Sequence, residues 1–182
     1  MRIDPVTIDG CYAIQPRVIA DARGSFIKTF HREVFEEYGL VTDFAEEYYS
    51  VSKKGVLRGM HFQTPPKDHF KLVYCLSGKV LDAIVDLRKG SPTYGVHAMF
   101  DLSAEQANML YIAPGIAHGF YALSDDVIMQ YKVTTVYSRE HDSGIRWDSA
   151  GIAWPNDRPV ISERDAGFVK LSEFDSPFQY EG

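Results

Sequence analysis

Two short segments of this chain combine residue types that do chemistry in enzymes. Within residues 55–63, Arg58 and His61 are three positions apart in a run that is otherwise typical of a strand. Within residues 113–120, a Pro-Gly turn leads to His118 between two small residues. Such side chains could transfer protons and pair with an anion, because imidazole titrates near neutral pH and a guanidinium keeps its charge. A surface arginine and buried structural histidines are the alternative interpretation.

The backbone decides whether the first pair can act together. Residues three apart in an extended strand point to opposite faces of a sheet. Arg58 and His61 therefore diverge unless Gly59 introduces a β-bulge that redirects one of them.

The segment around His118 resembles the second signature of the cupin barrels, many of which hold a metal ion. A mononuclear site typically needs two or three histidines and a carboxylate that converge. The corresponding first segment has His61 alone, followed by Gln63, Lys67, Asp68 and His69. We therefore expect no bound metal.

Composition narrows the class of protein. The 182 residues are 45% hydrophobic and 24% charged, which is the balance of an ordinary globular protein. No apolar stretch approaches the roughly 20 residues of a membrane span. Two cysteines, Cys11 and Cys75, cannot form a disulfide framework, which favours a reduced, cytoplasmic protein. The net charge of -6 argues against duplex nucleic acid as a partner.

Short β-branched and aromatic runs between scattered glycines and prolines predict the elements that position these residues. Strands are expected over residues 70–76, 79–86, 109–113 and 127–137. Ser77 and Gly78, between the first two runs, predict a β-hairpin. Short helices are expected over residues 31–38, before Gly39, and near residues 163–168. The pattern indicates one all-β domain over residues 1–182, a sandwich or a barrel.

Taken in order, several segments resemble the sugar-nucleotide 3,5-epimerases, the dTDP-4-dehydrorhamnose 3,5-epimerase family. The matching segments are residues 21–26, 56–63, 85–95, 114–120, 145–148, 154–155 and 162–165, together with Tyr131 and Tyr137. The resemblance runs from about Gly10 to Arg164. It implies a cupin-type jelly-roll β-barrel with a few short helices, and a homodimer that exchanges N-terminal strands.

The resemblance also implies an activity and the residues that carry it. The family's substrate is a nucleotide diphosphate linked to a 4-keto-6-deoxyhexose, and its members invert C3 and C5 without a cofactor. By analogy, His61 is the base and Asp165 orients it. Tyr131 would then reprotonate the sugar from the opposite face, and Lys71 would stabilise the enolate oxygen. Such enzymes serve the synthesis of deoxysugars for surface polysaccharides, including O-antigen, or for antibiotics.

Substrate binding is where this chain departs from its relatives. The implied binding residues are Arg23, Phe26, Lys28, Glu46, Tyr48, Arg58, His118, Asp142 and Arg164. The family usually has Glu, Gln and Asn at the positions of Lys28, Glu46 and Tyr48, which in relatives contact the thymidine end. Asp142 and Arg164 stand in for a Glu and a Lys. A site built to hydrogen-bond one base discriminates against others, so a cytidine-, uridine- or guanosine-linked sugar is an alternative to the thymidine-linked one.

The reaction itself also leaves several possibilities open. A C3-only epimerase is the nearest, and a ketoisomerase of related fold would move the carbonyl instead. From different classes come a metal-dependent cupin oxygenase and a non-catalytic cupin that binds the sugar nucleotide.

Overall fold

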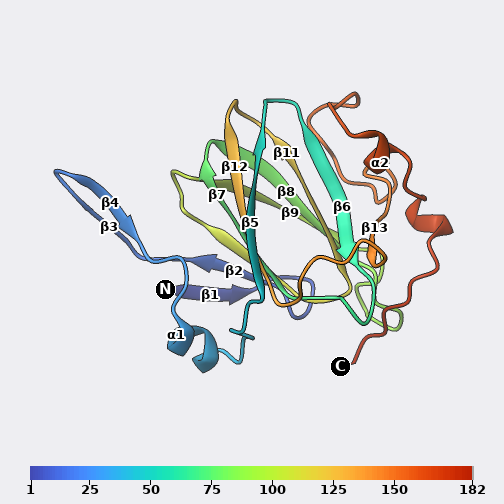
Figure 1. Ribbon diagram of the computed structural model, residues 1–182, viewed down its shortest axis with the longest axis horizontal. Coiled ribbons are helices and arrows are strands. Elements are labelled where there is room, and N and C mark those ends of the chain that lie inside the picture. Colours follow the sequence, from blue (N-terminus) through green and yellow to red (C-terminus); the bar gives the residue numbers. More distant parts are fainter. Residues whose placement is uncertain (182) are drawn as a thin grey trace.

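Two antiparallel β-sheets face each other in the computed structural model, which describes residues 1–181 (Figure 1). The larger sheet has six strands in the order β1-β2-β10-β7-β12-β5. Their bounds are β1 Arg2–Pro5, β2 Tyr12–Gln15, β10 Met109–Ile112, β7 Lys71–Ser77, β12 Val127–Val133 and β5 Glu46–Ser52.

The smaller sheet has five strands in the order β13-β6-β11-β8-β9. Their bounds are β13 Asp142–Gly144, β6 Leu57–Gln63, β11 Ile116–Ala122, β8 Lys79–Asp86 and β9 His97–Ser103. Apolar side chains from both sheets, among them Val73, Ile84, Leu110, Phe120 and Met129, form the largest buried cluster. Burying one such side chain contributes about 1.5–3 kcal/mol. This core holds the two sheets together and confirms the predicted all-β class.

The turn at Gly78 corrects one prediction. β7 and β8 follow each other in sequence, but β7 pairs with β10 and β12 while β8 pairs with β11 and β9. The expected hairpin is therefore wrong, because the chain passes at Gly78 from one sheet to the other. Gly78 has a φ of 76°, and a Cβ there would lie 2.4 Å from Ser124 Oγ. The glycine forms a tight corner between the sheets instead of a hairpin turn.

A β-bulge at Gly59 sets the direction of His61. His61 pairs with His118 and Arg58 with Phe120, so β6 advances three residues while β11 advances two. Residues two apart on β11 share a face, and Arg58 and His61 consequently share one as well. β6 also approaches β11 very closely, because a Cβ on Gly59 would lie 2.6 Å from the Cα of Gly119. The bulge that would bring Arg58 and His61 together is present.

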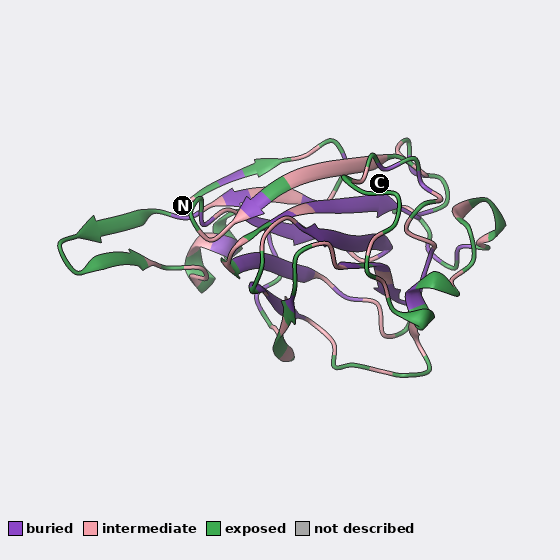
Figure 2. Ribbon diagram, turned by 90° about the horizontal axis from the view of Figure 1, so that it is seen from above, coloured by how far each residue is buried: buried purple, intermediate pink, exposed green. Residues whose placement is uncertain are grey.

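A two-stranded hairpin projects from the N-terminal side of the molecule. It consists of β3 Val18–Asp21 and β4 Gly24–Ile27, which pair only with each other. Figure 2 shows it extending away from the sheets, with nearly all of its residues exposed. Ile19 is 51% and Phe26 62% exposed. Large apolar side chains in such a position indicate a surface that another molecule covers.

The helices are short, as predicted. α1 spans Arg32–Glu37, and the chain leaves it through Gly39, whose φ is 70°. α2 spans Glu163–Ala166, and Ser162 Oγ accepts a hydrogen bond from the Asp165 backbone N–H as its cap. A 3-10 helix, Leu171–Glu173, follows. No helix within residues 1–181 is long and apolar enough to cross a membrane.

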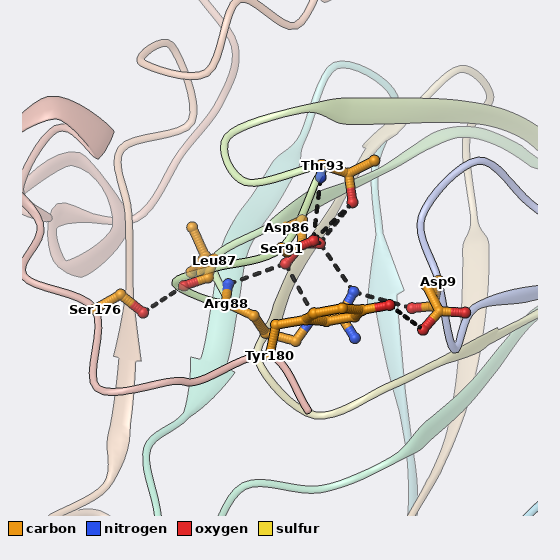
Figure 3. Close-up of polar contacts among 8 residues, drawn as sticks. All are labelled: Asp9, Asp86, Leu87, Arg88, Ser91, Thr93, Ser176 and Tyr180. Carbon is orange, nitrogen blue, oxygen red and sulfur yellow. Dashed lines mark hydrogen bonds and ion pairs between the residues drawn. The ribbon is translucent and has the colours of Figure 1, made fainter. Parts of the chain in front are cut away.

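The segment at the end of β8 forms a structural network, drawn in Figure 3. The buried carboxylate of Asp86 accepts hydrogen bonds from Arg88, Ser91 and Thr93 at 2.7–3.0 Å. Burial alone would raise the pKa of Asp86, but these hydrogen bonds lower it below its ordinary value. Arg88 also donates to the Asp9 carbonyl and lies over the ring of Tyr180. The network thus ties the N-terminal turn and the C-terminal segment to the end of β8.

Candidate active site

A cavity of about 310 Å³ lies where strands of both sheets meet the α2 segment. Its lining residues are Glu46 and Tyr48 from β5, His61, Phe62 and Gln63 from β6, Lys71 from β7, Val133 from β12, Asp142 from β13, His69, Tyr137 and Arg164. Six of the residues predicted from sequence are among them. The cavity therefore brings together parts of the chain that are far apart in sequence.

Asp165 holds His61 from the side of α2. His61 Nε2 lies 2.9 Å from Asp165 Oδ1, and the Gly59 backbone N–H donates to Asp165 Oδ2 at 3.2 Å. Burial would raise the pKa of Asp165, but the contact and charge of His61, together with the hydrogen bonds from Gly59 and Arg164, outweigh it and the pKa falls to about 2. Asp165 is therefore a carboxylate within hydrogen-bonding distance of His61 Nε2, and it accepts a hydrogen bond from Nε2–H when the imidazole is protonated.

Arg164 reaches over the same imidazole. One of its terminal nitrogens lies 2.7 Å from His61 Nε2, the other 2.5 Å from Asp142 Oδ2, and its Nε donates to Asp165 Oδ1 at 3.1 Å. Burial lowers the pKa of His61, and the charges of Arg164 and Lys71 lower it further against the opposing effect of Asp165. His61 is thereby held in the neutral form that a base requires.

Lys71 projects into the cavity from β7. Its Nζ donates to the backbone carbonyl of His61 at 3.2 Å, and the residue is only 7% exposed. Burial lowers the pKa of Lys71 to about 8, against the opposing charges of Asp142 and Asp82. An ammonium group at this depth is suited to stabilising a developing oxyanion.

Tyr131 lies next to the cavity but does not line it. Its ring stacks on that of Tyr48, with centroids 4.9 Å apart and planes 14° apart, and Tyr48 is the ring of the pair that lines the cavity. Tyr131 is 8% exposed, and burial raises the pKa of its phenol. The rings of His118 and Tyr131 meet in a T-shaped arrangement with centroids 6.1 Å apart, and His118 Nε2 contacts Asp82 Oδ2 at 2.8 Å. His118 and Tyr131 thus form a buried layer beside the cavity.

Five predicted binding residues lie outside the cavity within one chain, and His118 in the buried layer is one of them. Arg58 donates to Ser52 Oγ and to the Val51 carbonyl on β5. Arg23, Phe26 and Lys28 lie in or beside the projecting hairpin, where Arg23 pairs with Asp21. A single chain therefore does not bring the hairpin residues to His61.

His69, Gln63 and Tyr137 line the cavity but were not among the residues predicted to form the site. The signal for His69 was its spacing from Lys71, since residues two apart in extended chain point to the same face. Within residues 1–181, no three or more His, Cys, Asp or Glu side chains group in a way that could hold a metal ion.

Comparison with known proteins agrees with this geometry. The sequence pattern of the family described as dTDP-4-dehydrorhamnose 3,5-epimerase matches residues 5–173. A dTDP-4-dehydrorhamnose 3,5-epimerase of Methanothermobacter thermautotrophicus is 44% identical over 94% of this chain and 95% of its own length. A dTDP-4-dehydrorhamnose 3-epimerase of Streptomyces niveus is 37% identical over 95% of this chain and 85% of its own length.

The solved structures include a close match over the whole chain. The dTDP-6-deoxy-D-glucose-3,5-epimerase of Legionella pneumophila, in complex with dTDP-4-keto-L-rhamnose, superposes with a TM-score of 0.94 at 35% identity. The match covers 100% of this chain and 99% of the Legionella chain, which confirms the predicted cupin-type β-barrel. By sequence and by structure, this chain belongs to the dTDP-4-dehydrorhamnose 3,5-epimerase family.

Proposed function

We propose that this chain is an isomerase that inverts C3 and C5 of a dTDP-linked 4-keto-6-deoxyhexose without a cofactor. The observation that carries the proposal is the His61–Asp165 pair at the wall of the cavity, with the Lys71 ammonium beside it. The family and its relatives support the same reaction. The product then enters deoxysugar pathways such as dTDP-rhamnose and polysaccharide biosynthesis.

The chemistry follows from the ketone at C4. Protons on C3 and C5 are acidic because removal of either leaves an enolate with its charge on the C4 oxygen. In the proposal His61 takes the proton, and Asp165 stabilises the resulting imidazolium through Nε2–H. Lys71 faces the developing negative charge, and a donor of this kind lowers the barrier by about 3–4 kcal/mol.

Tyr131 returns a proton from the opposite face of the ring in this proposal. Because the Tyr48 ring stacks on Tyr131, Tyr48 has to shift before the Tyr131 hydroxyl can reach a sugar carbon. His118 packs edge-on against Tyr131 and supports its orientation. Tyr48 would then contact the substrate and also control access to the acid.

The nucleotide diphosphate would extend from the cavity toward cationic side chains. Arg58 shares the inward face of β6 with His61, and a guanidinium matches phosphate geometry. Arg23, Phe26 and Lys28 would reach the cavity of a second copy in a homodimer formed by strand exchange. The exposed apolar side chains of the hairpin support this arrangement. Cys11 and Cys75, which are buried free thiols, support a cytoplasmic location.

The decisive experiment is incubation with dTDP-4-keto-6-deoxyglucose in heavy water, with C3 and C5 followed by NMR. Deuterium at both carbons supports the proposal. Deuterium at C3 alone selects the C3-only epimerase, which the Streptomyces niveus relative favours as the second candidate. No exchange with the substrate bound would identify a non-catalytic binding protein. His61→Asn serves as the control and should abolish exchange.

A second measurement addresses the base. Lys28, Glu46 and Tyr48 offer hydrogen-bonding groups different from those usual in the family, so kcat/KM should be compared for dTDP-, UDP-, CDP- and GDP-linked substrates. A clear preference for the thymidine form supports the proposal. A preference for another base would assign the altered residues to recognition of that base.

A further inference from the structure

His69 lines the cavity without a role in the reaction proposed above. It precedes β7 and lies two residues before Lys71, and its side chain is 9% exposed. Its Nδ1 lies 3.0 Å from Thr135 Oγ1 and 3.3 Å from Gln63 Nε2. Its Nε2 is buried and has no hydrogen-bond partner within residues 1–181. A buried polar atom without a partner, on a side chain that lines a cavity, is unusual and calls for one.

The surrounding hydrogen bonds determine which nitrogen of His69 carries the proton. The Thr135 hydroxyl donates to the Lys67 carbonyl at 2.8 Å, so its hydrogen is directed away from His69. If Nδ1 were unprotonated, its lone pair would therefore face a lone pair of the Thr135 oxygen 3.0 Å away, and the two would repel each other. Protonated Nδ1 instead donates to that oxygen. The favoured tautomer is Nδ1–H, which leaves a free lone pair on Nε2.

Gln63 fixes this network from the other side. The backbone N–H of Ser138 donates to Gln63 Oε1 at 2.6 Å, which sets the orientation of the amide. The amide nitrogen then donates to the Lys67 carbonyl at 2.8 Å and to Thr135 Oγ1 at 3.2 Å. Both amide hydrogens have better acceptors than His69, so the amide does not compete for the lone pair of Nδ1.

His69 also stays uncharged. Burial lowers its pKa to about 3, and the charge of Lys71 acts in the same direction. At neutral pH its Nε2 is consequently an acceptor and cannot donate. A cationic ligand group is disfavoured here by the neighbouring ammonium of Lys71. The group that fits is a neutral donor, and a hydroxyl is the simplest neutral donor on a sugar.

We propose that His69 Nε2 accepts a hydrogen bond from a ring hydroxyl of the bound hexose, at C2 or C3, and so selects sugars that carry it. The inference rests on the proposed function, which places the sugar between His61 and Lys71. Two residues of extended chain span only about 7 Å, so a sugar that reaches Lys71 also lies near His69.

The first test needs no variant beyond the one that assigns the signal. Nitrogen-15 NMR of histidine-labelled enzyme should show the neutral Nδ1–H tautomer for His69, with the signal assigned by its loss in His69→Gln. Addition of the dTDP-linked sugar should shift the Nε2 resonance, whereas dTDP alone should not. An Nε2–H tautomer, or an Nε2 signal unmoved by the sugar, would overturn the inference. The latter result would mean that water alone satisfies the atom.

The second test measures selectivity in a cycle of enzyme and substrate changes. The parent substrate and its 2-deoxy and 3-deoxy analogues are compared by kcat/KM for deuterium exchange at C5. For the native enzyme, kcat/KM should be about tenfold to a hundredfold lower with one analogue than with the parent substrate. The variant His69→Phe keeps a flat ring but has no acceptor. Its kcat/KM for the parent substrate should be lower than that of the native enzyme by a similar factor, and its kcat/KM for that analogue should be little lower still. His69→Gln should restore part of the selectivity.

Controls separate this inference from folding and from the proposed function. Thermal unfolding of His69→Phe checks that the variant is folded. If folded His69→Phe discriminates against the deoxy analogue as strongly as the native enzyme does, the role of His69 is refuted. If the native enzyme exchanges deuterium but neither the Nε2 signal of His69 nor the effect of His69→Phe depends on the hydroxyl, only this inference fails. If it binds the sugar and shifts Nε2 but exchanges nothing, the proposed reaction fails and the acceptor role stands.

Discussion

Arg164 places a guanidinium nitrogen 2.7 Å from His61 Nε2 and is itself held by Asp142. The contact puts a positive charge against the imidazole proposed as the base. Positive charge beside a histidine favours its neutral form, and burial acts in the same direction. Arg164 therefore helps to keep His61 ready to accept a proton.

Removal of the Arg164 charge should change the pH dependence of the reaction. Below the pKa of His61 the base is protonated and the rate falls, so a higher pKa moves this acidic limb to higher pH. Arg164→Gln should produce that shift in kcat, and Arg164→Lys, which retains the charge, should not. The profile is measured by deuterium exchange across the pH range. An unmoved limb in Arg164→Gln would show that Arg164 does not tune His61.

Lys71 should control the alkaline limb of the pH–rate profile. Its pKa of about 8 means that the ammonium is lost as pH rises through that value, so the rate should decline above pH 8. Below pH 8, Lys71→Met should lower kcat by about 10²–10³-fold, because the charge facing the enolate is gone. Above pH 8 the difference should narrow, because the native enzyme then loses the same charge. Lys71→Arg, whose charge persists in alkali, should be slower than the native enzyme but keep its rate above pH 8. A decline unchanged in Lys71→Arg would assign that limb to another group.

Tyr48 should determine how deeply Tyr131 is buried. Tyr48→Ala removes the stacked ring, so the pKa of Tyr131 should fall toward its ordinary value, since burial is the main cause of its elevation. Tyr48→Phe keeps the ring and should leave that pKa high. Carbon-13 NMR of labelled tyrosine follows the titration, and Tyr131→Phe assigns the signal. No change in Tyr48→Ala would mean that other side chains bury Tyr131.

The proposed strand-exchange dimer should be detectable by complementation between two inactive variants. His61→Asn lacks the base but has an intact hairpin, whereas Arg23→Ala, Phe26→Ala lacks the hairpin contacts but has the base. Each variant alone should be nearly inactive. After subunit exchange, mixed dimers should regain one working site each, or about a quarter of all sites for random pairing. Absence of recovery in dimers proven to be mixed would show that the hairpin does not act on the partner.

Asp86 should contribute to stability and not to catalysis. Asp86→Asn leaves the Arg88 guanidinium without its buried carboxylate, and loss of such a partner costs about 3–5 kcal/mol. Because the pKa of Asp86 is lowered in the folded state, its contribution is present above the unfolded pKa near 4 and is lost as pH falls. Urea unfolding at pH 7 should show the loss in full, and the gap between variants should narrow in acid. Ser172→Ala, on the 3-10 helix, is the control.

Local sequence patterns predicted β7, β8, β10, β12 and both short helices, because alternation and a terminal glycine act within a few residues. The strand expected over residues 127–137 ends earlier, at Val133. The pairing of strands could not be predicted in the same way. Ser77 and Gly78 have the composition of a hairpin turn, but β7 and β8 pair in different sheets, and Ser124 and Val127 leave no room for a side chain at Gly78. That choice depends on residues that lie far along the chain, on the segment that leads into β12.

The candidate site, too, could be predicted from the sequence only in part. His61, Lys71 and Arg164 meet at one cavity as the motifs implied. The position of Tyr131 behind Tyr48 depends on the pairing of β5 with β12, which no motif reports. The acceptor nitrogen of His69 depends on where Thr135 directs its hydrogen, and that is visible only in three dimensions.

The contact between Gly59 and Gly119 has a consequence for how this enzyme can be altered. A methyl group at either position would meet backbone atoms of the other strand, so no compensating side-chain change can relieve the clash. Directed-evolution libraries aimed at new sugars should therefore leave both glycines untouched and diversify the cavity wall instead. Any lineage that lost one of them would have to rebuild the backbone that aims its base.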